Sequence, residues 1–171
     1  MSYSHLTSIL TFIVDTTDPI AELGFEAWLD DKKCYDIAHV GKTHLGHRLE
    51  YQLYVPWTDG DHELRFIMKN KTQAHTQIDG DGNIIKDASI IIDDLVFDGV
   101  KLGHILTEYA VYTHNQNIQF CPTVTDKFYG EMGYNGTVTF KFSTPICVWL
   151  NKIYAEMEIL PSFKGYLATG F

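Results

Sequence analysis

Oxygen-bearing side chains crowd the segment IDGDGNIIKD, residues 78–87. The candidate metal ligands in it are Asp79, Asp81, Asn83 and Asp87. Calcium binds carboxylate and amide oxygens in irregular loops, so this segment is a candidate calcium site. It is not an EF-hand, because Ile84 and Ile90 occupy the positions of the required glycine and bidentate glutamate.

The same segment also has the sequence of a β-hairpin turn. Its two Asp-Gly pairs supply the backbone conformations that tight turns need, and the flanks HTQI and NIIK suit short strands. Side chains two positions apart on a strand share a face, where Asp79 and Asp81 would repel each other. They therefore require either a turn or a cation. We expect chiefly a turn, with calcium as the alternative and as the one cofactor that the sequence suggests.

Three histidines lie close together in HVGKTHLGH, residues 39–47. If His39, His44 and His47 converged with a further ligand, they could bind zinc or copper, which gives the alternative of a small metal-dependent enzyme. The segment HELRF resembles the zincin motif HExxH, but Phe66 stands where the second histidine is needed. No GxSxG or P-loop motif is present. We expect a protein that is not an enzyme, with no catalytic residue assigned.

Aromatic residues make up 13% of the chain, and several fall at strand ends or turns. These rings belong to Tyr54, Trp57, Tyr112, Tyr129 and Tyr134. Such rings can stack on sugars or anchor a protein partner. Trp57 is the best exposed candidate, because Pro56 and an Asp-Gly pair place it in a turn. We take Trp57 and Tyr112 as candidate ligand-binding residues.

Charge and composition limit the function classes. The net charge of -9 argues against a nucleic-acid partner, since binding to phosphates needs clustered Lys and Arg. The apolar run at residues 9–14 is too short to span a bilayer, so we expect no membrane span. A chain of 171 residues that is 45% hydrophobic and has no linker predicts one folded domain.

Alternation of apolar and polar residues dominates the chain and predicts strands that have one face on a core. Candidate strands are residues 8–14, 23–29, 34–40, 47–55, 63–69, 89–97, 100–105, 108–113 and 137–142. These strands are short and are separated by turn signals such as Asp-Gly, the spacing typical of a sandwich. We expect an all-β fold, a β-sandwich of the jelly-roll type.

One helix is expected near the C-terminal end, in STPICVWLNKIYAEMEI. Thr144 can cap it, and Pro145 suits its first turn. Its apolar residues at helical spacing are Ile146, Trp149, Leu150, Ile153 and Met157. We place the sandwich and this helix in residues 1–158 and a C-terminal arm in residues 159–171. The aromatic residues of the arm, Phe163, Tyr166 and Phe171, are candidate interface residues for self-association or for another protein.

The segments LGFEAWLDDKKCYD, HRLEYQLYVPWTDGDHELRFIMKN and IIIDDLVFDGVKL resemble, in their order, the jelly-roll carbohydrate-binding modules that recognise xylan through calcium. The resemblance covers roughly residues 20–102 and rests on the pattern of strands. It implies that Asn70 and Asp87 fall where the family places calcium-loop residues, and it makes Asn70 the third candidate ligand-binding residue. Lys71 departs from the family, which has a carboxylate there, and an ammonium group opposes a neighbouring calcium ion.

The segments YTHNQN and KFYGEMGYNGTVTFKFSTPICVWL resemble virion proteins of tailed bacteriophages in their general sequence character. This resemblance implies a structural or host-recognition role in a virion. The first residues lack a secretion signal, so we expect synthesis in a host cytoplasm.

Three functional hypotheses follow. The first is a non-catalytic structural or adhesion protein of a phage virion, with glycan as its candidate ligand and virion proteins or further copies as partners. The second is the metal-dependent enzyme that uses the histidine cluster. The third is a calcium-stabilised assembly module without glycan affinity. A shallow aromatic groove would favour binding, and a deep polar cleft would favour catalysis.

Overall fold

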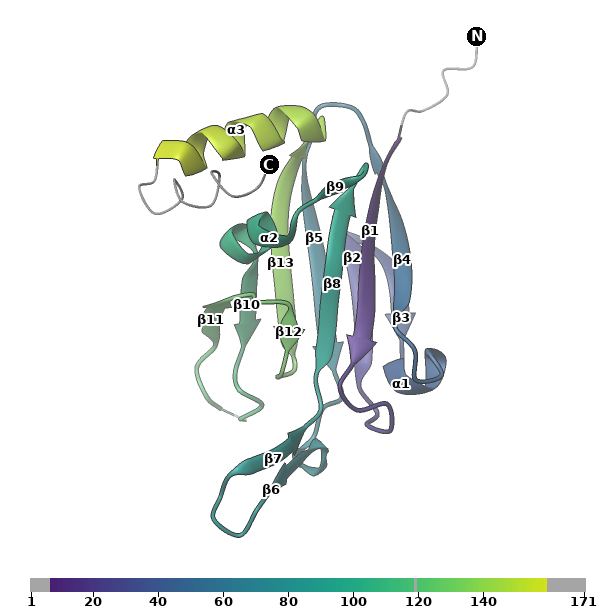
Figure 1. Ribbon diagram of the computed structural model, residues 1–171, viewed down its shortest axis with the longest axis vertical. Helices are drawn as coiled ribbons and strands as arrows, with labels where there is room; N and C mark the ends of the chain where they lie inside the picture. Colours follow the sequence, from purple (N-terminus) through teal and green to yellow (C-terminus); the bar gives the residue numbers. More distant parts are fainter. Residues whose placement is uncertain (1–6, 119, 160–171) are drawn as a thin grey trace.

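The computed structural model describes residues 7–118 and 120–159. Two antiparallel sheets pack face to face, which confirms the predicted all-β sandwich (Figure 1). The first sheet has the order β12-β8-β1-β4, with β9 beside β8. Its strands are β1 (Thr7–Thr16), β4 (Leu49–Pro56), β8 (Ile90–Phe97), β9 (Val100–Lys101) and β12 (Glu131–Met132). The chain passes repeatedly between the two sheets.

The second sheet has the order β11-β10-β13-β5-β2-β3. Its strands are β2 (Gly24–Leu29), β3 (Lys32–Ile37), β5 (Gly60–Lys69), β10 (Val111–His114), β11 (Val124–Lys127) and β13 (Gly136–Thr144). A separate hairpin of β6 (Thr76–Ile78) and β7 (Ile84–Asp87) projects from one end of the sandwich, after the short 3-10 turn η1 (Gln73–His75) (Figure 1).

The core lies between the sheets and is built from the alternating side chains that the sequence predicts. Leu64, Phe66 and Met68 of β5 are buried, and so are Phe140 and Phe142 of β13. The two strands run antiparallel in register, with Phe140 opposite Leu64 and Phe142 opposite His62. Aromatic rings fill the space between the sheets: the ring centroids of Phe12 and Phe66 are 4.8 Å apart.

The predicted C-terminal helix is confirmed as α3 (Ile146–Ile159). It covers one end of the sandwich, the end opposite the β6–β7 hairpin (Figure 1). Its side chains at positions 146, 150, 153 and 157 are buried, which follows the predicted helical spacing. Among the described helices, none is long and apolar enough to cross a membrane. The candidate interface residues Phe163, Tyr166 and Phe171 lie outside the described residues.

Two predicted strands are wrong between residues 100 and 110. The strand β9 ends at Lys101, and residues 103–109 form the helix α2 (Gly103–Tyr109). The buried residues are Leu102, Ile105, Leu106 and Ala110. Their spacing of three and four is that of one face of a helix. Apolar and polar residues also alternate in this segment, which is why a strand was predicted instead. The strand predicted at residues 108–113 therefore begins only at β10.

The strand predicted at residues 34–40 lies earlier in the structure, as β3, and the chain then turns into the short helix α1 (Val40–Thr43). His39 caps this helix, because its Nδ1 accepts a hydrogen bond of 3.1 Å from the amide of Lys42. Gly41 is required here: a Cβ atom at that position would lie 1.9 Å from the carbonyl oxygen of Pro19.

His44 follows α1 and is buried against β4. Its Nε2 lies 2.6 Å from the hydroxyl oxygen of Tyr51, and its side chain is 3% exposed. Burial lowers the pKa of His44 below its ordinary value, because the imidazolium form loses its solvation.

The stability of the protein should therefore fall as the pH drops below 6.5, the ordinary pKa of histidine. In that range the unfolded chain binds a proton at His44 that the folded chain excludes. The free energy of unfolding then rises with pH, by at most about 1.4 kcal/mol per pH unit for one proton. Urea denaturation across this range should show a shallower slope for His44→Phe than for the wild type. Identical slopes would contradict the assignment.

Candidate functional site

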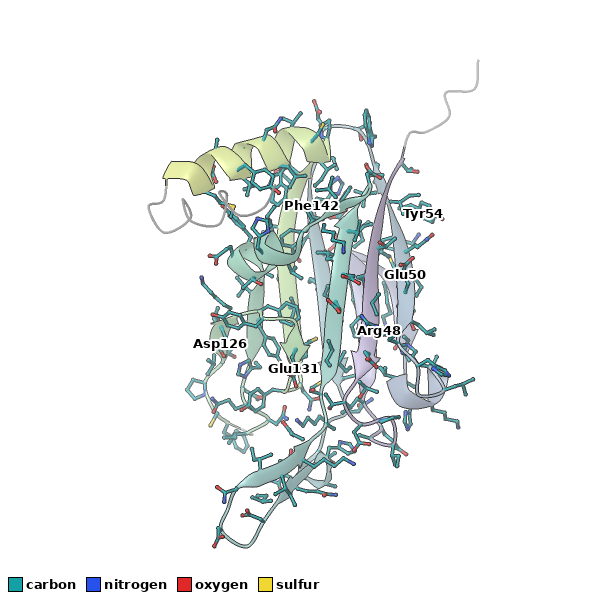
Figure 2. All side chains as sticks on the ribbon, in the orientation of Figure 1. Arg48, Glu50, Tyr54, Asp126, Glu131 and Phe142 are labelled. Carbon is teal, nitrogen blue, oxygen red and sulfur yellow. The ribbon has the colours of Figure 1, made fainter. Side chains whose placement is uncertain are left out.

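An open groove of about 450 Å³ lies where the chain crosses between the edges of the two sheets. Strand β11 is the edge of the second sheet, and β12 is the edge of the first. Residues 128–130 connect them, and residues 133–135 return the chain to β13. Asp126 and Glu131, which come from the two edge strands, lie on the same side of the sandwich (Figure 2).

The floor of the groove is an aromatic series that begins in the core. The ring of Phe128 is fully buried and packs edge-on against Tyr112, with 6.2 Å between the ring centroids. The ring centroids of Tyr112 and His114 are 4.7 Å apart. His114 in turn stacks on Tyr134, with 4.7 Å between the ring centroids and an angle of 17° between the rings. Phe128, Tyr112 and His114 are buried, and Tyr134 at the end of the series is 38% exposed. The floor is therefore held by the packing of the core.

Tyr112 holds the backbone of the groove in place. Its hydroxyl donates a hydrogen bond to the carbonyl oxygen of Tyr134 and accepts one of 2.9 Å from the amide of the same residue. Burial raises the pKa of Tyr112 to about 12, so the hydroxyl remains a donor. Tyr112, predicted as a ligand-binding ring, thus lies at the floor of the groove and positions Tyr134.

His114 is fixed by hydrogen bonds at both ring nitrogens. Its Nδ1 accepts from the amide of Gln116 at 3.1 Å, so the ring proton is on Nε2, which donates to Asp126 Oδ2 at 2.7 Å. The imidazole is buried, whereas the Asp126 side chain is 54% exposed. The bond to His114 orients a carboxylate that lines the groove.

The exposed wall of the groove carries Tyr129, Glu131 and Lys127. Tyr129 is 77% exposed, although its neighbour Phe128 is anchored in the core. Glu131 accepts a hydrogen bond from the hydroxyl of Ser89, and the ammonium of Lys127 lies 3.0 Å from Glu108. The positive charge in the groove is thus paired, and carboxylate oxygens and aromatic faces remain for a ligand.

This combination of groups favours reversible binding of a hydroxyl-rich molecule. Aromatic faces take the apolar side of a ligand, and oriented carboxylates accept hydrogen bonds from its hydroxyl groups. The groove is open and shallow, and the two nitrogens of His114 are already committed to hydrogen bonds within the protein.

The residues that the sequence suggested as ligand-binding do not come together. Trp57 is exposed in the turn before β5, and Asn70 follows the last residue of that strand. The length of β5 separates them by roughly 30 Å. Tyr112 belongs to the groove, on the other side of β13 from β5. The predicted exposure of Trp57 is confirmed.

The residues proposed for calcium divide into two places. Asp79, Asp81 and Asn83 form the turn of the β6–β7 hairpin, so the predicted hairpin is confirmed. Asp79 Oδ1 accepts hydrogen bonds from the amides of Asn83 and Asp81, at 2.8 and 2.9 Å. These donors, with Asn83 first, hold the pKa of the Asp79 carboxyl below its ordinary value. Asp87 lies at the other end of β7.

Asp87 is paired with Lys71. The Lys71 ammonium donates to Asp87 Oδ1 and to the carbonyl oxygen of Gly133, both at 2.6 Å. Its side chain is 3% exposed. A positive charge therefore already occupies the position next to Asp87, where the resemblance implies calcium. The same bonds tie the root of the hairpin to the groove.

The histidine cluster proposed for zinc or copper does not converge. His39 caps α1, His44 is buried on Tyr51, and His47 is exposed. Within residues 7–118 and 120–159, no group of three His, Cys, Asp or Glu side chains is placed to hold a metal ion.

A second group of side chains has the layout of a hydrolase triad. His62 lies 3.0 Å from Asp30 through Nδ1 and 3.0 Å from Thr144 Oγ1 through Nε2. A nucleophile must be reachable by its substrate. Thr144 is 5% exposed, and its hydroxyl donates to the carbonyl oxygen of Thr58 at 2.6 Å. The group ties together the β2–β3 turn, β5 and β13, and the Thr144 hydroxyl makes these bonds in place of the predicted helix cap.

No protein-family model, curated protein or solved structure matches the chain.

Sequence reasoning flagged Tyr129 and Tyr134 as aromatic residues near turns but missed His114, Asp126 and Glu131. Asp126 and His114 belong to adjacent strands, and Glu131 pairs with the opposite sheet, opposite Ile91. The hint in the sequence was the run YGEMGY, residues 129–134, in which two tyrosines flank two glycines and a glutamate.

Replacing Lys71 by methionine should destabilise the fold by about 2–3 kcal/mol, because it leaves Asp87 and a buried carbonyl without their charged donor. The matched control is Lys86→Met, which removes an exposed ammonium 3.2 Å from Asp18 and should cost about 1 kcal/mol or less. Urea denaturation of both variants measures the difference. Equal losses would show that the Lys71 bonds contribute little.

Calcium should leave the melting temperature unchanged, because the Asp79 carboxylate is occupied by amide donors and Asp87 by Lys71. Thermal unfolding in excess calcium and in chelator tests this. Binding would instead stabilise the fold, by about 2.7 kcal/mol at a hundredfold excess over Kd. A rise that disappears in the Asp79→Ala, Asp81→Ala variant would establish a calcium site at the hairpin turn.

Proposed function

We propose that this protein is a non-catalytic β-sandwich module that binds glycans in the groove between β11 and β12. The observation that carries the proposal is that the exposed rings of Tyr129 and Tyr134 line the same groove as the Asp126 carboxylate, which His114 orients. Stacking surfaces and hydrogen-bond acceptors are thereby present on one open surface.

The rigidity of the groove supports a binding role. Tyr134 is held by the Tyr112 hydroxyl through its backbone and by His114 through ring stacking. A surface that is ordered before binding loses less conformational entropy when it takes a ligand. Affinity can then come from a small number of contacts.

The charge of the groove favours neutral or amino-bearing sugars. Asp126 and Glu131 line it, the Lys127 charge is paired with Glu108, and the whole chain has a net charge of -9. Sugars with carboxylate or sulfate groups would meet like charge, which opposes their approach.

The biological setting that we propose is the virion of a tailed bacteriophage, made in the host cytoplasm, where the module would have a structural or adhesion role. This proposal rests on the resemblance of two segments to virion proteins of tailed bacteriophages. The segments are YTHNQN and KFYGEMGYNGTVTFKFSTPICVWL. Part of the groove lies in the second segment. Mass spectrometry of purified particles is the direct test of this setting.

Catalysis is the weaker alternative. Its best candidate, the Asp30, His62 and Thr144 group, has its hydroxyl buried and bonded to a backbone carbonyl. A calcium-stabilised assembly module without glycan affinity is the other alternative, and thermal unfolding in excess calcium and in chelator tests it.

An array of neutral, amino-bearing and anionic glycans should show binding of the first two classes. For a glycan that binds, Tyr129→Ala should weaken the affinity roughly fivefold, as expected for a stacking contact of about 1 kcal/mol. Tyr54→Ala is the matched control, because Tyr54 is also exposed but lies on the far side of the sandwich from Asp126 (Figure 2). Isothermal titration calorimetry provides the affinities.

Equal affinities of the Tyr129→Ala and wild-type proteins would show that the glycan does not bind in the groove. Preferential binding of anionic glycans would contradict the role of Asp126 and Glu131.

A further inference from the structure

The end of the molecule opposite α3 exposes an unusual number of large apolar side chains. Those on the hairpin are Ile78, Ile84 and Ile85, and those on the neighbouring loop are Ile118 and Phe120. Ile78 and Ile84 are register partners across the hairpin, so they share a face. A single exposed isoleucine is ordinary, whereas several on one surface indicate an interaction site.

Three of these isoleucines converge on one cavity. Ile78 and Ile84 from the hairpin and Ile118 from the loop line a hollow of about 570 Å³. Gln73, Gln116 and Tyr134 are among the polar side chains around it. An apolar centre with a polar rim is the usual anatomy of a protein–protein contact, and a concave one suits aromatic anchors.

The cavity is built into the fold. The hairpin wall is fixed at its root by Lys71, which joins Asp87 to the carbonyl oxygen of Gly133. On the loop wall, Gln116 and Asn117 have φ angles of 58° and 57°. Two consecutive non-glycine residues in the left-handed region are uncommon and persist where the surroundings hold them, as at binding surfaces.

We propose that this cavity binds the C-terminal segment of a second copy of the chain, residues 160–171. That segment, LPSFKGYLATGF, supplies Phe163, Tyr166 and Phe171 as apolar anchors. Lys164 is its one charged side chain, and the hairpin carries Asp79 and Asp81 at its turn. The apolar side chains of the segment thus match the apolar side chains that line the cavity, and the carboxylates that could pair with Lys164 follow directly after the lining residue Ile78.

The geometry favours contact between copies. Helix α3 ends at Ile159, at the opposite end of the sandwich from the hairpin (Figure 1). The twelve residues that follow reach at most roughly 40 Å, which is enough to enter a neighbour placed end to end. Because the two contact surfaces differ, such an interface is heterologous and generates rings or filaments. This inference does not depend on glycan binding.

The test uses two variants of the whole chain. The cavity variant is Ile78→Ser, Ile84→Ser, and the tail variant is Phe163→Ser, Tyr166→Ser, Phe171→Ser. The matched control is Ile85→Ser, because Ile84 and Ile85 are both 64% exposed but only Ile84 lines the cavity. Thermal unfolding should show that all three remain folded; in the cavity variant and the control the substituted isoleucines are exposed.

Sedimentation velocity should give oligomers for the wild type and the Ile85→Ser control, and monomers for the cavity and tail variants. An equimolar mixture of the two monomeric variants should form a one-to-one complex that grows no further, because each provides one half of the interface. A monomeric wild type would overturn the proposal in favour of docking within one chain or no docking. Persistence of oligomers in either variant, or no complex in the mixture, would also overturn it.

Discussion

The packing of aromatic rings between the two sheets is the interaction on which both the fold and the groove depend. Phe12, Phe25 and Phe66 fill the middle of the sandwich, and their ring centroids lie 4.8 to 6.5 Å apart. The same kind of contact continues outward through Phe128 and Tyr112 to the groove. The stacking surface of the groove is therefore an extension of the core. A substitution that leaves a cavity in the core near Phe128 would shift the ring of Tyr134.

Lys71 is the second constraint, and it acts on a different part of the fold. One buried ammonium group holds the hairpin through Asp87 and the β12–β13 connection through Gly133. The resemblance proposed from the sequence would place calcium in this region. A side-chain cation can join the same kinds of oxygen atoms without depending on the concentration of free metal. Buried ion pairs of this kind fix geometry more clearly than they add stability.

The sequence predicted the sheets well and the site poorly, for physical reasons. Along β5 and β13, alternation identified the core side chains, such as Phe66 and Phe140, because a strand with one face on a core has a period of two. The helix α2 was missed, since its buried face is short and overlaps the alternation of its neighbours. The groove depends on which edge strands meet across the sandwich, and local periodicity carries no information about that. Of the groove residues, the sequence identified only the tyrosines Tyr112, Tyr129 and Tyr134 in advance.

The β6–β7 hairpin forms a sheet of its own, and the bonds of its turn are local. Asp79 closes the turn on residues two and four positions away, so residues 79–83 can change in length or composition without shifting the register of either large sheet. The sequence of this tip can therefore diverge among related chains. Ile78 and Ile84, which flank the tip and line the cavity, are under more constraint. For protein engineering, the tip is a natural place to graft a peptide onto an otherwise unchanged scaffold.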